Sequence, residues 1–205
     1  MARKQQEKSL QTQRELLESA EKLFAAKGFV ATTIAEITTD AGYAKGNFYR
    51  YWDSKDDIML EIIAHKMQSY RQMRDTALSN ASSLVDVMDH ILTFLETMID
   101  DRNWSAVFLE FTIHASRDPE LRARLNQSIY RLSNDIFEDI VAPHITSTYP
   151  ARKIGALNTA LFEGFLVHSL LETNTIDRAD FRRAAMKLAL ANATGESPSQ
   201  STTSP

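Results

Sequence analysis

The segment TIAEITTDAGYAKGNFYRYW, residues 33–52, decides the fold of this chain. Its apolar spacing predicts two helices of about seven residues each, joined by a turn at Gly42-Tyr43. Gly42 suits a turn position with positive φ, which glycine adopts at little steric cost. Ile37 and Phe48 are spaced to fill the angle between the two helices. This pattern predicts a helix-turn-helix unit, whose second helix fits the major groove of DNA, about 12 Å wide.

The second helix of this unit carries side chains suited to DNA. Asparagine such as Asn47 bonds adenine through two hydrogen bonds, and lysine such as Lys45 reaches guanine acceptors or phosphate. Thr33 and Ser54 begin helices, whose free N–H groups favour phosphate. The alternative is a tight helix pair inside a bundle. Several phosphate-type groups around one polar helix favour the DNA interpretation.

Outside this segment the apolar spacing is helical almost everywhere. Thr12-x-x-Glu15, Thr33-x-x-Glu36 and Ser54-x-x-Asp57 have the spacing of helix-starting capping motifs. A further short helix is expected over about 44–51, and longer helices at about 83–99, 102–116, 119–140, 150–173 and 178–193. The prediction is an all-α fold of about nine helices. It has a helix-turn-helix domain at 1–55 with a flexible basic arm at 1–9, a helical body at 56–193, and a disordered tail at 194–205.

From Gly28 to about Ile58 the sequence resembles the TetR family of transcriptional regulators. The matching residues, in register, are Gly28, Phe29, Thr32, Thr33, Ile34, Ile37, Ala41, Gly42, Gly46, Phe48, Tyr49, Tyr51, Lys55 and Ile58. The segment at 111–125 also resembles a helix junction common in the family. The chain departs from the family pattern at Thr38, Tyr43, Ala44 and Trp52. Ala44 replaces a capping serine, which costs the reading helix about 1 kcal/mol.

The resemblance implies a set of DNA-contacting residues. Those expected near base edges or adjoining phosphates are Lys45, Gly46, Asn47 and Tyr51. Those expected as phosphate anchors are Thr33, Tyr49 and Lys55. These departures leave open which bases are read, but they do not change the expected mode of DNA binding.

The body carries a stripe of small residues with a four-residue period in the predicted helix 150–173. Its members are Ala156, Ala160 and Gly164. Such a stripe permits close packing of a second helix, either in the same chain or in a partner. The resemblance favours a partner, because the last two helices of that family form a dimer seam. The matching stripe on the final helix is Phe181, Ala185 and Leu188.

The resemblance also implies an effector cavity in the body. The residues expected to line it are Trp104, Phe108, Phe111, His114, Phe162, Phe165 and His168. The alternative for each aromatic residue is plain core packing, and for each histidine a satisfied core position.

Composition narrows the remaining function classes. The net charge is −4, but residues 1–55 hold nine basic against seven acidic residues, and residues 56–205 hold fourteen against twenty. The absence of cysteine excludes disulfides and thiolate metal sites. No metal-binding histidine spacing, glycine-rich phosphate loop or nucleophile elbow is present, so we expect no catalytic residue, no metal and no cofactor. The polar N-terminus and the lack of a long apolar run predict a cytoplasmic protein without a membrane contact.

These observations predict a homodimeric regulator of transcription that is not an enzyme. Its expected partners are a palindromic double-stranded DNA operator and a small-molecule effector. We expect the protein to be a repressor that the effector releases from the operator. The alternatives are a regulator without an effector, or an activator, and more remotely a helical-bundle enzyme.

Overall fold

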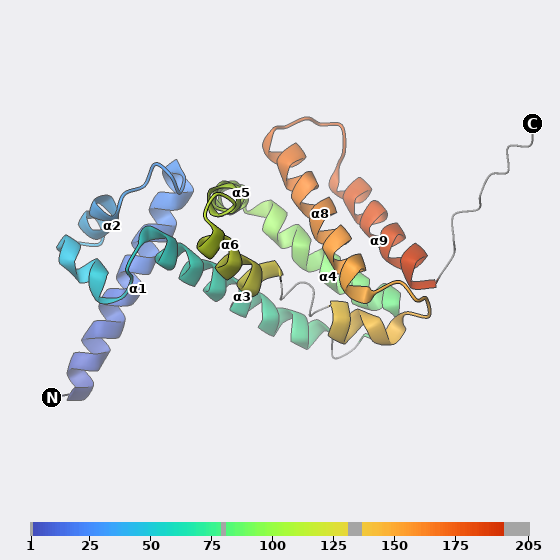
Figure 1. Ribbon diagram of the computed structural model, residues 1–205, viewed down its shortest axis with the longest axis horizontal. Helices are drawn as coiled ribbons and strands as arrows, with labels where there is room; N and C mark the ends of the chain where they lie inside the picture. Colours follow the sequence, from blue (N-terminus) through green and yellow to red (C-terminus); the bar gives the residue numbers. More distant parts are fainter. Residues whose placement is uncertain (1, 79–80, 131–136, 195–205) are drawn as a thin grey trace, which may run out of the picture. The chain divides into compact units, whose positions relative to one another are not determined.

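The computed structural model describes residues 2–78, 81–130 and 137–194 (Figure 1). Over these residues the chain is built from helices and has no strand, which confirms the all-α class. The elements are α1 (Ala2–Lys27), α2 (Ile34–Asp40), η1 (Lys45–Arg50), α3 (Lys55–Leu78), α4 (Leu84–Asp100), α5 (Arg102–Ala115), α6 (Pro119–Leu125), η2 (Asn126–Tyr130), η3 (Phe137–Val141), η4 (Ala142–His144), α8 (Ala151–Leu170) and α9 (Arg178–Thr194). Among these described helices, none is long and apolar enough to span a bilayer.

The chain divides into two compact units. The first comprises residues 1–71 and 101–128, and the second comprises residues 72–100 and 129–205. Helices α5 and α6 therefore group with the N-terminal helices, although the sequence assigned them to the body. The boundary expected after residue 55, between a DNA-binding domain and a helical body, stays a prediction.

The core of the first unit is an aromatic cluster that joins α1, the following loop and α5. Phe24 and Phe29 lie 5.3 Å apart between ring centroids, and Phe29 meets Phe111 edge-on at 4.9 Å. All three rings are almost completely buried. Leu16 and Ala20 extend the same buried stripe along α1, which the helical spacing predicted.

Polar bridges also hold α5 and α6 within this unit. The Glu110 carboxylate accepts hydrogen bonds from the backbone N–H groups of Phe29 and Val30, at 2.7 and 3.0 Å. Gly28 is required beside it, because its φ is +88° and an added Cβ would lie 2.8 Å from the carboxylate. His114 Nε2 lies 3.0 Å from Asp56 Oδ1. The N-terminal residues 1–55, here called the head, are thus held to α5 by the buried aromatic cluster and by charged side chains.

Helix α1 differs from the sequence-based prediction. It begins at Ala2, so the expected start at Thr12 is wrong, and residues 2–9, expected as a flexible arm, are helical. The Thr12 hydroxyl donates to the Lys8 carbonyl oxygen at 3.1 Å, a bond within the helix. The residues before Thr12 are mostly Gln, Lys, Glu and Arg, which are strong helix formers, so the helix continues through the capping pattern.

The second unit packs α4, η3, α8 and α9 together. Phe181 of α9 stacks on Phe165 of α8 with ring centroids 5.2 Å apart. Arg182 of α9 forms an ion pair with Glu96 of α4 at 2.9 Å and a second with Asp89. These contacts join α9 to α4 and α8.

The predicted helix 119–140 is shorter and less regular than expected. Helix α6 ends at Leu125, and π-helical turns follow as η2 and η3. Residues 131–136 lie outside the described residues, as does the predicted tail beyond Thr194.

Candidate nucleic-acid interface

Helix α2, the turn after it and η1 form the predicted helix-turn-helix. Ile37 and Phe48 are both 0% exposed and fill the angle between the two helices, as predicted. Gly42 has a φ of +77°, the left-handed conformation that the turn required. The capping box at Thr33 is present, with its hydroxyl accepting from the Glu36 N–H at 3.3 Å. The sequence therefore located this unit correctly.

The second helix is a 3-10 helix in this structure. Ala44 stands at its N-cap and makes no side-chain capping bond. Without a cap, the free N–H groups of the first turn have no side-chain acceptor there.

The polar side chains of η1 lie on the face away from Phe48. Lys45, Gly46 and Arg50 are exposed, and Tyr49 is 49% exposed. Asn47 is half-buried, and its Nδ2 donates to the Ala44 carbonyl oxygen at 3.3 Å. A short helix with one buried aromatic anchor and a polar outer face matches what a groove-reading helix requires.

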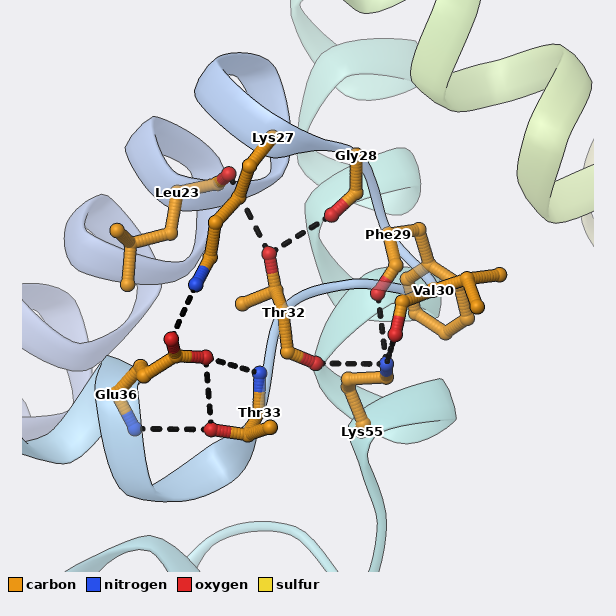
Figure 2. Close-up of polar contacts among 9 residues, drawn as sticks. All are labelled: Leu23, Lys27, Gly28, Phe29, Val30, Thr32, Thr33, Glu36 and Lys55. Atoms are coloured by element: carbon orange, nitrogen blue, oxygen red, sulfur yellow. Dashed lines mark hydrogen bonds and ion pairs between the residues drawn. The ribbon is translucent and has the colours of Figure 1, made fainter.

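Thr33, predicted as a phosphate anchor, already has an anion beside it (Figure 2). Its N–H and its hydroxyl both donate to Glu36 Oε2, at 2.9 and 2.8 Å. Lys27 pairs with the other oxygen of Glu36, and the bonds from Lys27 and Thr33 lower the pKa of the Glu36 carboxyl to about 2. Glu36 therefore stays ionised and occupies the N-terminus of α2 that a phosphate would approach.

Lys55, also predicted as a phosphate anchor, is used inside the chain (Figure 2). Its ammonium donates to the carbonyl oxygens of Phe29, Val30 and Thr32 at 2.6, 3.1 and 2.7 Å. The same ammonium lies 4.4 Å from the centroid of the Phe29 ring, and burial lowers its pKa. All three donors of an ammonium group are thereby engaged, which points to a structural role in closing the loop between α1 and α2.

Tyr51, predicted near the bases, instead meets α1. Its hydroxyl donates to the Ser9 carbonyl oxygen at 3.0 Å and lies 3.0 Å from the Ser9 hydroxyl. Tyr43 also contacts α1, six residues beyond Ser9. Its hydroxyl donates to Glu15, and this bond lowers the pKa of Glu15 and raises that of Tyr43. The sequence did not predict either of these hydrogen bonds to α1. A tyrosine at position 43, where the family pattern has valine, was the available signal.

Four residues predicted for the effector cavity lie on α5 in the first unit. Trp104, Phe108 and Phe111 are buried, and Phe111 belongs to the aromatic core that contains Phe29. His114 pairs with Asp56. Trp104 lines a cavity of about 40 Å³ together with Lys66, whose ammonium lies 4.6 Å from its ring centroid. That volume suits one or two water molecules, whereas small-molecule pockets measure about 300–1,000 Å³.

The other three predicted cavity residues lie on α8 in the second unit. Phe162 and Phe165 are buried against Phe181, at ring-centroid distances of 6.0 and 5.2 Å. His168 is exposed, with Nδ1 2.9 Å from the Thr173 hydroxyl. The two phenylalanines are packed in the core, which was the alternative to a cavity position. An effector contact for Phe162, Phe165 and His168 stays a prediction.

The predicted dimer seam divides into an exposed and a buried part. On α8, Ala156, Ala160 and Gly164 are all exposed. On α9, Phe181 and Ala185 are buried at 2% and 0% exposure, and Leu188 is half-buried. Phe181 and Ala185 are therefore core residues of their own chain, because the apolar stripe of α9 packs onto α8 and α4. The exposed stripe of α8 remains available to a partner.

Family models match both parts of this chain. A model of bacterial regulatory proteins of the TetR family matches residues 16–62, which include the helix-turn-helix. A model described as the C-terminal part of BetI-type transcriptional repressors matches residues 86–192.

Individual relatives agree with these models. The HTH-type transcriptional regulator YdgC of Bacillus subtilis is 29% identical over 92 residues, which cover 44% of this chain and about half (47%) of that protein. The solved structure of FadR from B. subtilis with stearoyl-CoA has a TM-score of 0.71 at 17% identity, covering 87% of this chain and 98% of that one. A transcriptional regulator from Saccharomonospora viridis in complex with choline has a TM-score of 0.70 at 18% identity, covering 89% and 97%. With its head and its C-terminal segment both matched, this chain belongs to the TetR family of bacterial transcriptional regulators.

Proposed function

We propose that this TetR-family regulator is a homodimeric repressor that binds a palindromic operator and is released by a small-molecule effector. The observation that carries the proposal is the reading helix η1. Its aromatic anchor Phe48 is completely buried, while Lys45, Gly46 and Tyr49 are exposed beside it. This arrangement holds a polar helix face rigidly outward, as recognition of base edges requires.

Within the interface we assign base contacts to Lys45, Gly46 and Asn47, and phosphate contacts to Tyr49. Thr33 is given no phosphate, because its N–H and hydroxyl already donate to the Glu36 carboxylate. Asn47 is the residue most suited to specificity, because its amide can both donate to and accept from adenine. The engaged hydroxyl of Tyr51 and the engaged ammonium of Lys55 support positioning roles for these two residues.

Dimerisation is proposed through the exposed stripe of α8. Ala156, Ala160 and Gly164 would let a partner helix approach closely, and Leu157 and Val167 beside them are 41% and 43% exposed. The small residues and the exposed apolar side chains beside them support packing of a partner helix on this face. A two-fold dimer would present two reading helices and so favour a palindromic site.

Release by an effector is supported by the relatives. The solved neighbours described above hold stearoyl-CoA in one case and choline in the other. These two ligands share little chemistry, so the fold does not select a ligand class for this chain. The competing function is a regulator that needs no effector. An enzyme has less support, since the family models that match this chain describe regulators of transcription.

The test is selection of binding sites from random DNA with the purified chain, in parallel with the DNA upstream of its own gene. We expect an enriched inverted repeat, a dimer by light scattering, and weaker DNA binding when an effector found by thermal-shift screening is added. Failure to enrich any sequence would contradict DNA recognition. Enrichment without response to a broad compound library would favour the effector-independent regulator.

A further inference from the structure

We propose that the first turns of α1 form a second DNA-contacting segment, in which Lys4 and Lys8 bind phosphates next to those at the reading helix. Tyr51 and Tyr43 hold this segment in place. The inference rests on the proposed DNA-binding function and extends it to a part of the chain that sequence analysis treated as a flexible arm.

The two tyrosines connect α1 to both ends of η1. Tyr51 follows the last residue of η1, and its hydroxyl donates to the Ser9 carbonyl oxygen at 3.0 Å while the Ser9 hydroxyl lies at the same distance. Tyr43 precedes η1, donates to Glu15, and lies 3.4 Å from the Thr12 hydroxyl. Contacts at two points, separated by more than one helical turn of α1, fix both the position and the rotation of α1 relative to the reading helix.

Lys4 and Lys8 continue the stripe of α1 that meets the tyrosines. The spacing of four, four and three residues from Lys4 through Lys8 and Thr12 to Glu15 places all four on one side of a helix. Lys4 and Lys8 are both exposed. The acidic member of the stripe, Glu15, has its carboxylate on the Tyr43 hydroxyl. Two cations therefore lie on the side of α1 that faces the reading helix, beyond the point where Tyr51 attaches.

The reach of this segment matches a DNA strand. At about 1.5 Å of rise per residue, Lys4 lies about 7.5 Å along α1 from Ser9. Phosphates on one strand follow at about 3.4 Å along the duplex axis, so the segment extends the interface by about two phosphates. The alternative is a solvated helix end that touches nothing. A solvated end has no need of the tyrosine hydrogen bonds that fix its direction.

The experiment measures operator affinity against salt concentration for the full chain on the site selected above. Lys4→Gln and Lys8→Gln should each lower the slope of log K against log salt by about one, and weaken binding at about 0.1 M salt by about fivefold to tenfold. Arg14→Gln is the matched control, since it removes one exposed charge from the same helix, and should leave the slope unchanged. An unchanged slope in the two lysine variants would overturn the proposal.

A thermodynamic cycle tests the role of Tyr51. Tyr51→Phe should weaken binding several-fold in the wild-type chain and by less than twofold in the Lys4→Gln, Lys8→Gln background, because the two lysines whose position it fixes are then absent. Circular dichroism should show the same helical content in all variants. Equal losses in both backgrounds would mean that Tyr51 contacts DNA itself and would refute the positioning role. If the wild-type chain binds no specific site, the proposed function fails; if it binds and the variants match it, only this inference fails.

Discussion

The reading helix η1 buries one aromatic side chain, whereas α9 buries an apolar stripe. In η1 the core anchor and the exposed face are neighbours: Phe48 is 0% exposed and Tyr49 is 49% exposed. In α9 the stripe that was predicted to meet a partner chain is buried in its own chain, with Phe181 stacked on Phe165. Spacing along a helix therefore identifies an apolar face but does not show whether the same chain or a partner chain covers it.

The largest effect that would sharpen this comparison is expected at Phe181. Phe181→Ala should lower the free energy of unfolding by about 3–5 kcal/mol, because it opens a cavity against Phe165 and Phe162. Denaturant unfolding followed by circular dichroism measures the loss. Ala160→Glu on the exposed face of α8 is the control. It should change the free energy of unfolding little at a concentration where the chain is monomeric, and it should weaken dimerisation at higher concentration. If Phe181→Ala dissociates dimers without lowering stability, α9 forms the seam after all.

A smaller loss is expected at Lys55. Lys55→Met keeps the apolar stem near Phe29 and removes three hydrogen bonds to carbonyl oxygens, so we expect a loss of about 2 kcal/mol and a melting temperature lower by about 4–8 °C. Thermal unfolding gives the value. A variant that melts like wild type yet binds operator with a reduced salt dependence would return Lys55 to the phosphate anchors that the sequence predicted.

Asn47 should respond in the opposite manner. Asn47→Ala removes a half-buried amide and its long, 3.3 Å hydrogen bond to the Ala44 carbonyl oxygen, so stability should stay within about 0.5 kcal/mol. Operator affinity should fall by about tenfold to a hundredfold, with relaxed preference at one base pair of each half-site. Fluorescence anisotropy on operators substituted at single positions separates the two effects. A uniform loss on all sequences would show that Asn47 contributes to backbone binding.

The smallest effect concerns Glu36. Its folded pKa of about 2 lies below its ordinary value of 4.5, so its ionised form stabilises the fold above pH 4.5, and this contribution is lost as the pH falls from 4.5 toward 2. The stability difference between wild type and Glu36→Gln should therefore be constant above pH 5 and shrink below pH 4.5. An NMR titration of the Glu36 side chain, with a midpoint well below 4, checks the cause. A midpoint near 4.5 would contradict it.

The sequence predicted what depends on residues close together in the chain. The turn at Gly42, the capping box at Thr33 and the buried pair of Ile37 and Phe48 all arise within twenty residues, and local spacing reveals them. The extension of α1 to Ala2 was missed because a capping pattern at Thr12 outweighed the helix propensity of the residues before it.

The contacts that the sequence did not predict join distant segments. Glu110 bonds the N–H groups of Phe29 and Val30 about eighty positions away, and Tyr51 reaches Ser9 across forty-two. A carboxylate or a tyrosine hydroxyl shows its partner only when the packing of α1 and α5 is known. Spacing alone likewise did not show that Phe181 and Ala185 of the predicted α9 seam are buried within their own chain, and a seam on α9 stays a prediction.

The most direct test of the central claim is an anisotropy titration of the wild-type chain on the selected inverted repeat and on a scrambled duplex of the same composition, between 50 and 200 mM salt. We expect binding to the repeat at least about a thousandfold tighter than to the scrambled duplex, with the logarithm of the affinity for both falling linearly with log salt. Equal affinity for the two duplexes would contradict the assignment of η1 as a reading helix.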